Sequence, residues 1–409
     1  MTAGSRGDVA PFTGLGAALV GAGHDVTLVT HGLFADLTEG SGVRFHALPI
    51  DPRAELHSDR GRGLHRSGTG TGKLLRVMAM AKSVAGELTP GLVEAAKGSD
   101  VLVLSGGVAP LGCSIAEGLG LPSVGVNLQP MHPTREFAPP MAGLRSLGPT
   151  GNRLAGHAVN AVIERIFTDA ARGVRAQLGL PPGSVAATRR VRERQGWPVL
   201  HGFSPHIVPR PADWRPGLDV VGYWWPYDMG QLPAELEDFL DAGPPPVYIG
   251  LGSATVPDPV RFTEQIVRAL RTAGLRGVIQ QGWAGLTATG DDILTIGEVP
   301  HSRLFPRMAA VVHHAGAGTA AAGLRAGVPA VPVPVQFDEI FWAARLTALG
   351  TAPCALPLPK LTAARLAEAL VRATSDPSYR ERAGTLAARL ATEDAVGPVD
   401  AVLRRTLDA

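Results

Sequence analysis

Two histidines, two glycines and a threonine fall within one short segment, "HHAGAGT" (313–319). An apolar β-branched run precedes it, and a run of small residues typical of a helix follows. Glycines let a ligand approach the backbone, and free N–H groups at a helix N-terminus favour an anion. The segment therefore predicts a diphosphate site, the alternative being a turn that only packs against a neighbour. We expect the site to use His314, Gly316, Ala317, Gly318 and Thr319.

Two adjacent carboxylates, Asp338 and Glu339, follow the next predicted strand in "PVPVQFDE". They stand at the expected start of a helix, where acidic residues often serve only as first-turn caps. Beside a phosphate-binding turn, they could instead accept hydrogen bonds from sugar hydroxyls. Both interpretations stay open from the residues alone.

A third carboxylate, Asp8, lies in "GSRGD" almost at the first residue, directly before a helical pattern. Such a carboxylate could be a general base, or a helix N-cap or first-turn acid ahead of Pro11. The two roles are compatible, because a capping side chain can also face a cleft.

The elements that must position these residues alternate between strand and helix along the whole chain, which predicts an α/β fold with mostly parallel sheets. Two similar doubly wound halves are expected, with ligands bound at the carboxyl ends of strands in a cleft between the halves. The predicted strands are 26–30, 43–48, 101–105, 123–127, 247–251, 277–281, 293–296, 310–313 and 330–333.

A Pro- and Trp-rich stretch (203–228) interrupts this alternation and indicates the end of one domain and a linker. We expect an N-terminal domain, a linker region, a C-terminal domain, and a last helical segment. Their predicted ranges are 1–212, 213–240, 241–385 and 386–409.

Composition excludes several classes of protein. Of 409 residues, 45% are hydrophobic and 18% charged, which is typical of a folded globular protein and argues against disorder. A net charge of +2 predicts no nucleic-acid partner, and no apolar run is long enough for a transmembrane segment. Two isolated cysteines, Cys113 and Cys354, and no apparent signal peptide lead us to expect a cytoplasmic protein.

Two segments imitate known nucleotide-binding motifs. "SGTGTGKLL" (67–75) lacks the first Gly and the last Ser or Thr of a phosphate loop, and no strand precedes it. "GAGTAAAG" (316–323) fits the dinucleotide pattern, but no acidic residue ends a strand about 20 residues later. A dehydrogenase is therefore disfavoured.

Seven segments occur together in the order found in one family. "GSRGDVAP", "LQPMHPTREF", "VPRPADW…VVGYW", "VYIGLGSA", "QQGW", "GEVPHSRLFPRMAAVVHHAG" and "AGVPAVPVPVQFDEIFWA" together resemble the GT-B nucleotide-sugar glycosyltransferases. The chain is most similar to their sterol 3-β-glucosyltransferase and glycopeptide-antibiotic glycosyltransferase branch. This resemblance implies two Rossmann-like domains facing a central cleft, with C-terminal helices packing back toward the N-terminal domain. It also implies that the N-terminal domain (1–212) binds the acceptor, that the C-terminal domain (241–385) binds the nucleotide sugar, and that the last helix (386–409) returns to the N-terminal domain.

The resemblance also implies roles for donor-binding residues. Trp283 in "QQGW" would stack on the pyrimidine, although a core aromatic that closes a strand is the alternative. Val299 would bind the base through its backbone, and Ser253 would help to hold the diphosphate of a UDP- or TDP-sugar. Asp338 and Glu339 occupy the family's usual Asp-Gln pair. Because an ionised Glu only accepts hydrogen bonds, Glu339 would suit an amino sugar or accept from another hydroxyl.

For the reaction, the resemblance implies that Asp8 takes the proton of an acceptor hydroxyl, which attacks the anomeric carbon with inversion. Ser5 and Arg6 are expected to approach the diphosphate across the cleft. The helix N-terminus at 316–319 would stabilise the leaving group. We expect neither a metal nor another cofactor, consistent with the lack of an Asp-x-Asp pair.

Acceptor binding is expected from His132 and Phe137, although "PTREFAPP" could be only a rigid loop. The basic loop 53–76 could touch a large or lipid-like acceptor, which keeps peripheral membrane contact open, or could simply be solvated. The chain is expected to be a monomer or a homodimer.

The sequence thus predicts an inverting O-glycosyltransferase acting on a hydrophobic natural product or sterol-like acceptor. The alternatives are a sugar-nucleotide epimerase and a non-catalytic helper or ligand-binding protein with the same fold. Only Met1, Thr2 and Ala3 precede the "GSRGD" turn, where the family has a full strand. We therefore expect either a native start further upstream or a shortened central strand.

Overall fold

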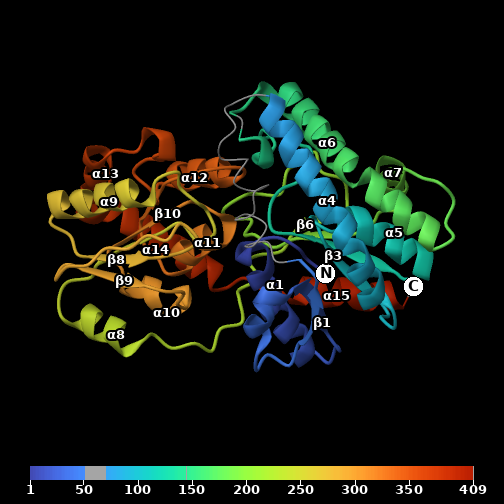
Figure 1. Ribbon diagram of the computed structural model, residues 1–409, viewed down its shortest axis with the longest axis horizontal. Coiled ribbons are helices and arrows are strands. Elements are labelled where there is room, and N and C mark those ends of the chain that lie inside the picture. Colours follow the sequence, from blue (N-terminus) through green and yellow to red (C-terminus); the bar gives the residue numbers. More distant parts are fainter. Residues whose placement is uncertain (51–70, 144, 409) are drawn as a thin grey trace.

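The computed structural model describes residues 1–50, 71–143 and 145–408. It contains two halves, each with parallel β-strands flanked by helices (Figure 1). The N-terminal half is mainly blue to green in this view, and the C-terminal half is mainly yellow to orange. This arrangement confirms the predicted α/β fold class. Within the described ranges, no helix is long and apolar enough to cross a membrane.

The strands of the N-terminal half form a pair, β1-β2, and a four-stranded sheet in the order β3-β4-β5-β6, all parallel. Their bounds are β1 (Thr27–His31), β2 (Arg44–Leu48), β3 (Leu102–Ser105), β4 (Ser123–Asn127), β5 (Val199–His201) and β6 (Leu218–Val220).

The first residues of the chain join these two groups of strands. The Thr2 N–H donates to the carbonyl of Val29 in β1 (3.0 Å). On the other side, the Met1 amino group donates to the carbonyl of Val103 (2.8 Å), and the Ser105 N–H donates to the Met1 carbonyl (3.1 Å). The segment before the "GSRGD" turn therefore lies between β1 and β3, at the place expected for a shortened central strand.

Helices α4, α5 and α6 pack against one another in this half (Figure 1). Fully buried apolar side chains, among them Leu92, Leu111, Ile115 and Val174, fill the space between them and the sheet. The helices of this half are α1 (Arg6–Gly21), η1 (Gly32–Thr38), α4 (Thr71–Ala96), α5 (Ala109–Leu119), η2 (Pro140–Ala142), α6 (Gly148–Gln177) and α7 (Val185–Arg194).

The C-terminal half has a five-stranded parallel sheet in the order β11-β10-β7-β8-β9. Its strands are β7 (Val247–Gly250), β8 (Gly277–Gln280), β9 (Ile293–Ile296), β10 (Ala310–His313) and β11 (Ala330–Pro332). β7 and β10 are neighbours, with His313 paired to Gly250, so the turns that follow these two strands lie side by side.

Helices cover this sheet and then return the chain to the first half. The helices are α8 (Ala234–Asp241), α9 (Pro259–Ala273), α10 (His301–Leu304), η3 (Phe305–Arg307), α11 (Ala317–Arg325), α12 (Glu339–Ala348), η4 (Leu358–Lys360), α13 (Ala363–Ser375), α14 (Pro377–Leu390) and α15 (Gly397–Leu407).

The last helix confirms the predicted return to the N-terminal half. α14 contacts α11 and α13, whereas α15 contacts β4 and buries Val399 and Leu403 against Val124 and Val126. The predicted boundary at 385/386 falls inside α14, and the chain crosses between the halves at 391–396.

The Pro- and Trp-rich stretch also contributes to the N-terminal sheet. β6 pairs with β5, where Leu218 lies opposite Val199, and both side chains are buried. The sheet therefore continues past the predicted domain boundary at residue 212. Sequence patterns did not indicate β5 and β6, because these short strands stand beside Pro, Gly and Trp residues that are typical of loops.

Candidate functional site: facing carboxylates and a glycine-rich turn

The predicted diphosphate turn leaves β10 in a strained conformation. His313 is fully buried, and its Nδ1 accepts a hydrogen bond from the Ala315 N–H (3.0 Å). Ala315 has a left-handed φ of 67°. Such a conformation costs a residue other than glycine roughly 1–3 kcal/mol, so it persists only where its surroundings impose it. The hydrogen bond from the Ala315 N–H to His313 Nδ1 helps to impose this conformation.

The His314 ring is held between two glycines. A Cβ added to Gly252 would lie 3.1 Å from His314 Cε1, and one added to Gly316 would lie 2.4 Å from Nε2. The Nδ1 atom is buried and has no hydrogen-bond partner among the described residues. Burial lowers the pKa of His314 to about 4, so the ring is neutral at pH 7. The turn thus contains a buried polar atom that no described protein group satisfies.

Helix α11 begins immediately after this turn. Gly316 is its N-cap and offers no side-chain oxygen to the first-turn N–H groups. Those N–H groups and the positive end of the helix dipole therefore remain available to an anion. Ala317, Gly318 and Thr319 form the first residues of the helix, as the sequence predicted.

The other predicted donor-binding residues lie after neighbouring strands. Ser253 is half-buried in the turn after β7. Trp283 lies in the turn after β8, where its backbone N–H donates to the Gly252 carbonyl (2.9 Å). Its side chain is half-buried and belongs to none of the hydrophobic clusters of the described residues. Val299 follows β9 and packs against the core.

Asp338 is the N-cap residue of α12, and its side chain is buried. Its Oδ2 accepts a hydrogen bond from the Trp342 indole N–H (2.8 Å). Burial raises the pKa of Asp338 to about 6, and the nearby charge of Asp8 adds to that rise, whereas a hydrogen bond from Gln129 opposes it. Asp8 and Gln129 belong to the N-terminal half, so Asp338 reaches the interface between the halves.

Glu339 is also buried and holds the loop that precedes it. Its Oε2 accepts hydrogen bonds from the backbone N–H groups of Val335 (2.6 Å) and Gln336 (2.7 Å). Burial raises the pKa of Glu339 to about 7 despite these two donors. One carboxyl oxygen is therefore committed to the loop, and contact of the other oxygen with a sugar stays a prediction.

Asp8 lies in the first turn of α1 and is partly buried. Its Oδ2 accepts hydrogen bonds from the backbone N–H (2.8 Å) and the hydroxyl (3.0 Å) of Ser5. Burial raises the pKa of Asp8, and both Ser5 contacts oppose the rise. A carboxylate with a raised pKa is a better base than an exposed one.

Arg6 bridges the two halves. Its guanidinium donates to Glu298 Oε2 (2.7 Å), and both side chains are about half exposed. Glu298 directly precedes Val299, so Arg6 lies against the segment expected to bind the base. Its contact with a diphosphate stays a prediction.

The two expected acceptor residues lie in aromatic contacts. The His132 ring meets His201 and Trp214 edge-on at centroid distances of 5.4 and 5.8 Å. Burial lowers the pKa of His132 to about 4. Phe137 packs against Phe341 of α12 (5.2 Å), across the interface between the halves. These packing roles are observed, and acceptor contact by either residue stays a prediction.

Sequence reasoning missed Gln129 and Glu298, which reach across the interface to Asp338 and Arg6. Each is a polar residue within two positions of a strand's carboxyl end, after β4 and β9 respectively. That position was the available signal, because ligand-binding residues collect there in doubly wound folds.

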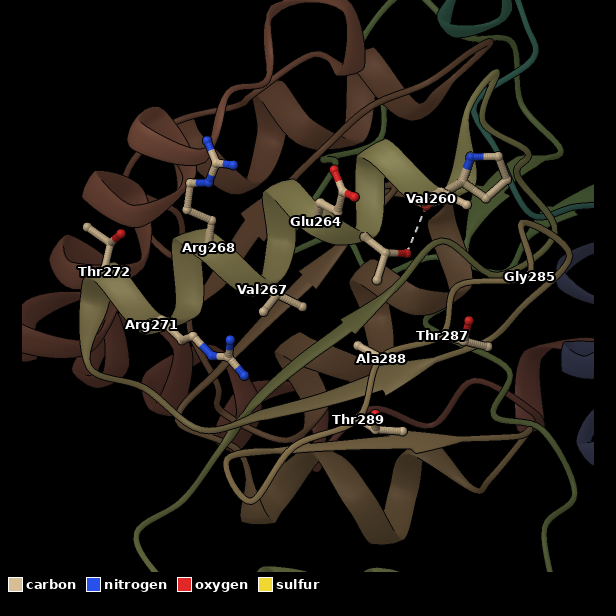
Figure 2. Close-up of a pocket in the computed structure, with 12 residues that line it drawn as sticks. Val260, Glu264, Val267, Arg268, Arg271, Thr272, Gly285, Thr287, Ala288 and Thr289 are labelled. Carbon is tan, nitrogen blue, oxygen red and sulfur yellow. Dashed lines mark hydrogen bonds between the residues drawn. The ribbon is translucent and has the colours of Figure 1, made fainter.

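A separate pocket of about 960 Å³ lies between α9 and the segment before β9 (Figure 2). Arg268 and Arg271 stand on its helical side, and Thr287 and Thr289 stand opposite. It contains none of the predicted site residues. The phosphate-loop-like segment and the basic loop 53–76 fall largely outside the described residues. Within the described ranges, no three His, Cys, Asp or Glu side chains are arranged to hold a metal ion.

Comparisons with known proteins agree with this fold and site. The N-terminal domain of glycosyltransferase family 28 matches residues 1–124. The C-terminal domain of erythromycin biosynthesis protein CIII-like proteins matches residues 277–404. Together the two matches cover the turn after Ala3 and the turn after β10.

Individual relatives cover nearly the whole chain. O-mycaminosyltylonolide 6-deoxyallosyltransferase of Streptomyces fradiae is 36% identical over 97% of this chain and 94% of its own length. A sterol 3-beta-glucosyltransferase of Arabidopsis thaliana is 34% identical over 96% of this chain, which spans 63% of that relative. The solved structure of glycosyltransferase VinC in complex with dTDP has a TM-score of 0.67 at 21% identity, covering 99% and 98% of the two chains.

The two-domain α/β fold and these matches identify a GT-B glycosyltransferase. The chain belongs to the GT-B nucleotide-sugar glycosyltransferases, with relatives among both the sterol 3-β-glucosyltransferases and the antibiotic glycosyltransferases. The family predicted from the sequence segments is confirmed.

Proposed function

We propose that the protein is an inverting, metal-independent O-glycosyltransferase. It moves a sugar from a UDP- or TDP-sugar to a hydroxyl of a hydrophobic natural product or sterol-like acceptor. The observation that carries this proposal is that α1, whose first turn holds Asp8, lies against the C-terminal half: Arg6 donates to Glu298 Oε2 (2.7 Å), and α1 contacts α11, the helix that follows the glycine-rich turn. The base and the site of the leaving diphosphate must both lie beside the transferred sugar.

Asp8 acts as the general base. Its Oδ2 is held by Ser5, and Oδ1 has no hydrogen-bond partner among the described residues. Oδ1 takes the proton of the acceptor hydroxyl as the acceptor oxygen forms its bond to the anomeric carbon. Such a positioned base contributes typically ~10²–10⁴-fold to the rate. Attack from the side opposite the leaving group inverts the anomeric centre.

The bond from the anomeric carbon to the diphosphate breaks in the same step, and negative charge develops on the leaving group. The unsatisfied N–H groups of α11 and the His314 ring are the donors that stabilise it. These fixed dipoles supply what a divalent cation would otherwise supply, which supports a metal-independent reaction.

The donor lies along the C-terminal half. Trp283 stacks on the pyrimidine, Val299 binds it through the backbone, and Asp338 accepts from sugar hydroxyls. The dTDP bound in VinC supports a nucleoside diphosphate of this kind. The sterol and the O-mycaminosyltylonolide in the names of the two sequence relatives support an apolar aglycone.

The test is product formation with UDP-glucose and TDP-glucose and a panel of sterol and macrolide aglycones, followed by mass spectrometry and anomeric NMR. The wild type should form an inverted glycoside, and Asp8→Asn should lose transfer while still binding nucleotide. Asn keeps an oxygen for the Ser5 contacts, so the cap survives. Asp36→Asn, at an exposed carboxylate of the same half, is the matched control.

Three results would overturn the proposal. Undiminished transfer by Asp8→Asn would remove the base. A change in the sugar without any acceptor would instead indicate an epimerase, and nucleotide binding with no reaction at all would indicate a non-catalytic helper.

A further inference from the structure

Phe337 combines two features that are each unusual for an aromatic residue. Its φ is 50°, in the left-handed region where bulky side chains are genuine outliers. Its exposed fraction is 50%, so burial in the core does not compensate for the backbone strain. A glycine would adopt this conformation freely. A gain in folding stability therefore does not explain a phenylalanine at this position.

A second exposed apolar side chain, Ile340, lies one helical turn away and is 41% exposed. We name Phe337 and Ile340 the apolar lip. Gly143 of the N-terminal half lies against both, because a Cβ built there would be 3.3 Å from Ile340 Cδ1 and 3.7 Å from the Phe337 carbonyl oxygen. The apolar lip thus stands where the two halves meet.

The apolar lip also borders the reaction centre. Phe337 directly precedes Asp338, whose buried carboxyl interacts with the charge of Asp8. The Cα atoms of Phe337 and Asp338 are about 3.8 Å apart, as in any pair of consecutive residues, so the backbone of the apolar lip continues directly into Asp338. Any acceptor whose hydroxyl reaches Asp8 must extend the rest of its skeleton away from that point. Phe341, which follows Ile340 in α12, packs against Phe137 of the N-terminal half (5.2 Å).

We propose that the apolar lip binds the aglycone of the acceptor, with Phe337 as the residue that selects a flat, apolar ring system. This inference rests on the proposed glycosyl transfer. Scattered exposed apolar residues are common and carry no meaning alone. Here three observations concern one place. The backbone of Phe337 is strained, Phe337 directly precedes Asp338, and Gly143 of the N-terminal half lies against both residues of the apolar lip.

The test replaces Phe337 by Gly and by Asn, both of which tolerate a left-handed φ. Val260→Asn is the control, since Val260 is a 70% exposed apolar residue at the start of α9. Binding of 4-methylumbelliferone, cholesterol and O-mycaminosyltylonolide is measured by equilibrium titration, and binding of UDP and TDP by calorimetry. The Tm of each variant reports folding.

Both Phe337 variants should bind the apolar probes about tenfold more weakly, with unchanged nucleotide affinity and no fall in Tm. Val260→Asn should match the wild type throughout. Equal binding of all three probes by the Phe337 variants and the wild type would overturn the inference, as would failure of the wild type to bind any probe. Absence of sugar transfer by a wild type that binds the probes would instead count against the proposed function alone.

Discussion

Ser5 donates two hydrogen bonds, from its backbone N–H and its hydroxyl, to a single oxygen of Asp8, Oδ2. The two donors fix the carboxylate against the first turn of α1 and leave Oδ1 directed elsewhere. Both contacts favour the ionised form, while burial favours the neutral form and prevails. Oδ2 thus takes part in the cap, and Oδ1 is the oxygen that the proposed catalytic role would use.

Replacing Ser5 by Ala should shift the pH profile of transfer. Loss of the hydroxyl removes one donor to the ionised carboxylate, so the pKa of Asp8 rises further. A base must be deprotonated to act, so the acid limb of kcat/KM should move to higher pH by up to about one unit. Rates above the new limb should change little. Ser5→Thr keeps the hydroxyl and should keep the wild-type profile, and an unmoved limb in Ser5→Ala would contradict the assignment.

The turns that carry the chemistry could be predicted because their signals are local. At β10 and α11 the chain has an apolar run of four or five residues, then a glycine-rich turn, then a small-residue helix. Each of these patterns can be recognised from a few consecutive residues. The same reasoning located β1 to β4 and β7 to β11. Asp8, Asp338 and Glu339 could be singled out because they stand at helix starts after strands.

The contacts across the interface could not be predicted, because no local pattern encodes them. Arg6 and Glu298 are separated by 292 residues, and their contact depends on how the two sheets are placed. The left-handed φ of Phe337 could not be predicted from the sequence for a different reason. The sequence offers a phenylalanine where that conformation normally indicates glycine, so the residue type argues against the backbone that it adopts.

Replacing Glu339 by Gln should stabilise the protein at neutral and alkaline pH. The pKa of Glu339 is raised from an ordinary 4.5 to about 7, so the folded state holds a proton that the unfolded state releases between these values. Stability therefore falls as pH rises through this window, by roughly 3 kcal/mol in total. Gln carries no charge and can still accept from the loop N–H groups, so urea denaturation should show the variant increasingly more stable than wild type between pH 5 and 8.

The difference between the wild-type and Glu339→Gln curves of unfolding free energy against pH reports Glu339 alone. Asp338 adds its own pH dependence to both curves, and this cancels in the difference. Glu264→Gln, at an exposed position of α9, should run parallel to the wild type. If Glu339→Gln also ran parallel to the wild type, the buried carboxyl would have an ordinary pKa.

Two glycines of the diphosphate turn should respond oppositely to alanine. At Gly316, the new Cβ would lie 2.4 Å from His314 Nε2, and the ring cannot retreat because Gly252 lies against its other side. Gly316→Ala should therefore lower the unfolding free energy by about 1–3 kcal/mol. Gly318 has nothing within 4 Å of an added Cβ and lies in α11, so Gly318→Ala should stabilise by up to about 1 kcal/mol. Thermal unfolding of the ligand-free protein checks both, and equal shifts would mean that His314 is free to move.

A comparison of Trp283 with Trp342 tests whether Trp283 stacks on the nucleotide base or belongs to the core. Trp342 is 1% exposed and donates to Asp338, so Trp342→Ala should cost about 3–5 kcal/mol of stability. Trp283 lies outside the hydrophobic clusters of the described residues, so Trp283→Ala should cost less than about 1 kcal/mol. Base stacking contributes about 1–3 kcal/mol, and calorimetry should therefore show UDP and TDP binding weakened about tenfold or more. Trp283→Phe should recover most of that affinity. A large stability loss in Trp283→Ala with unchanged nucleotide affinity would make Trp283 a core residue after all.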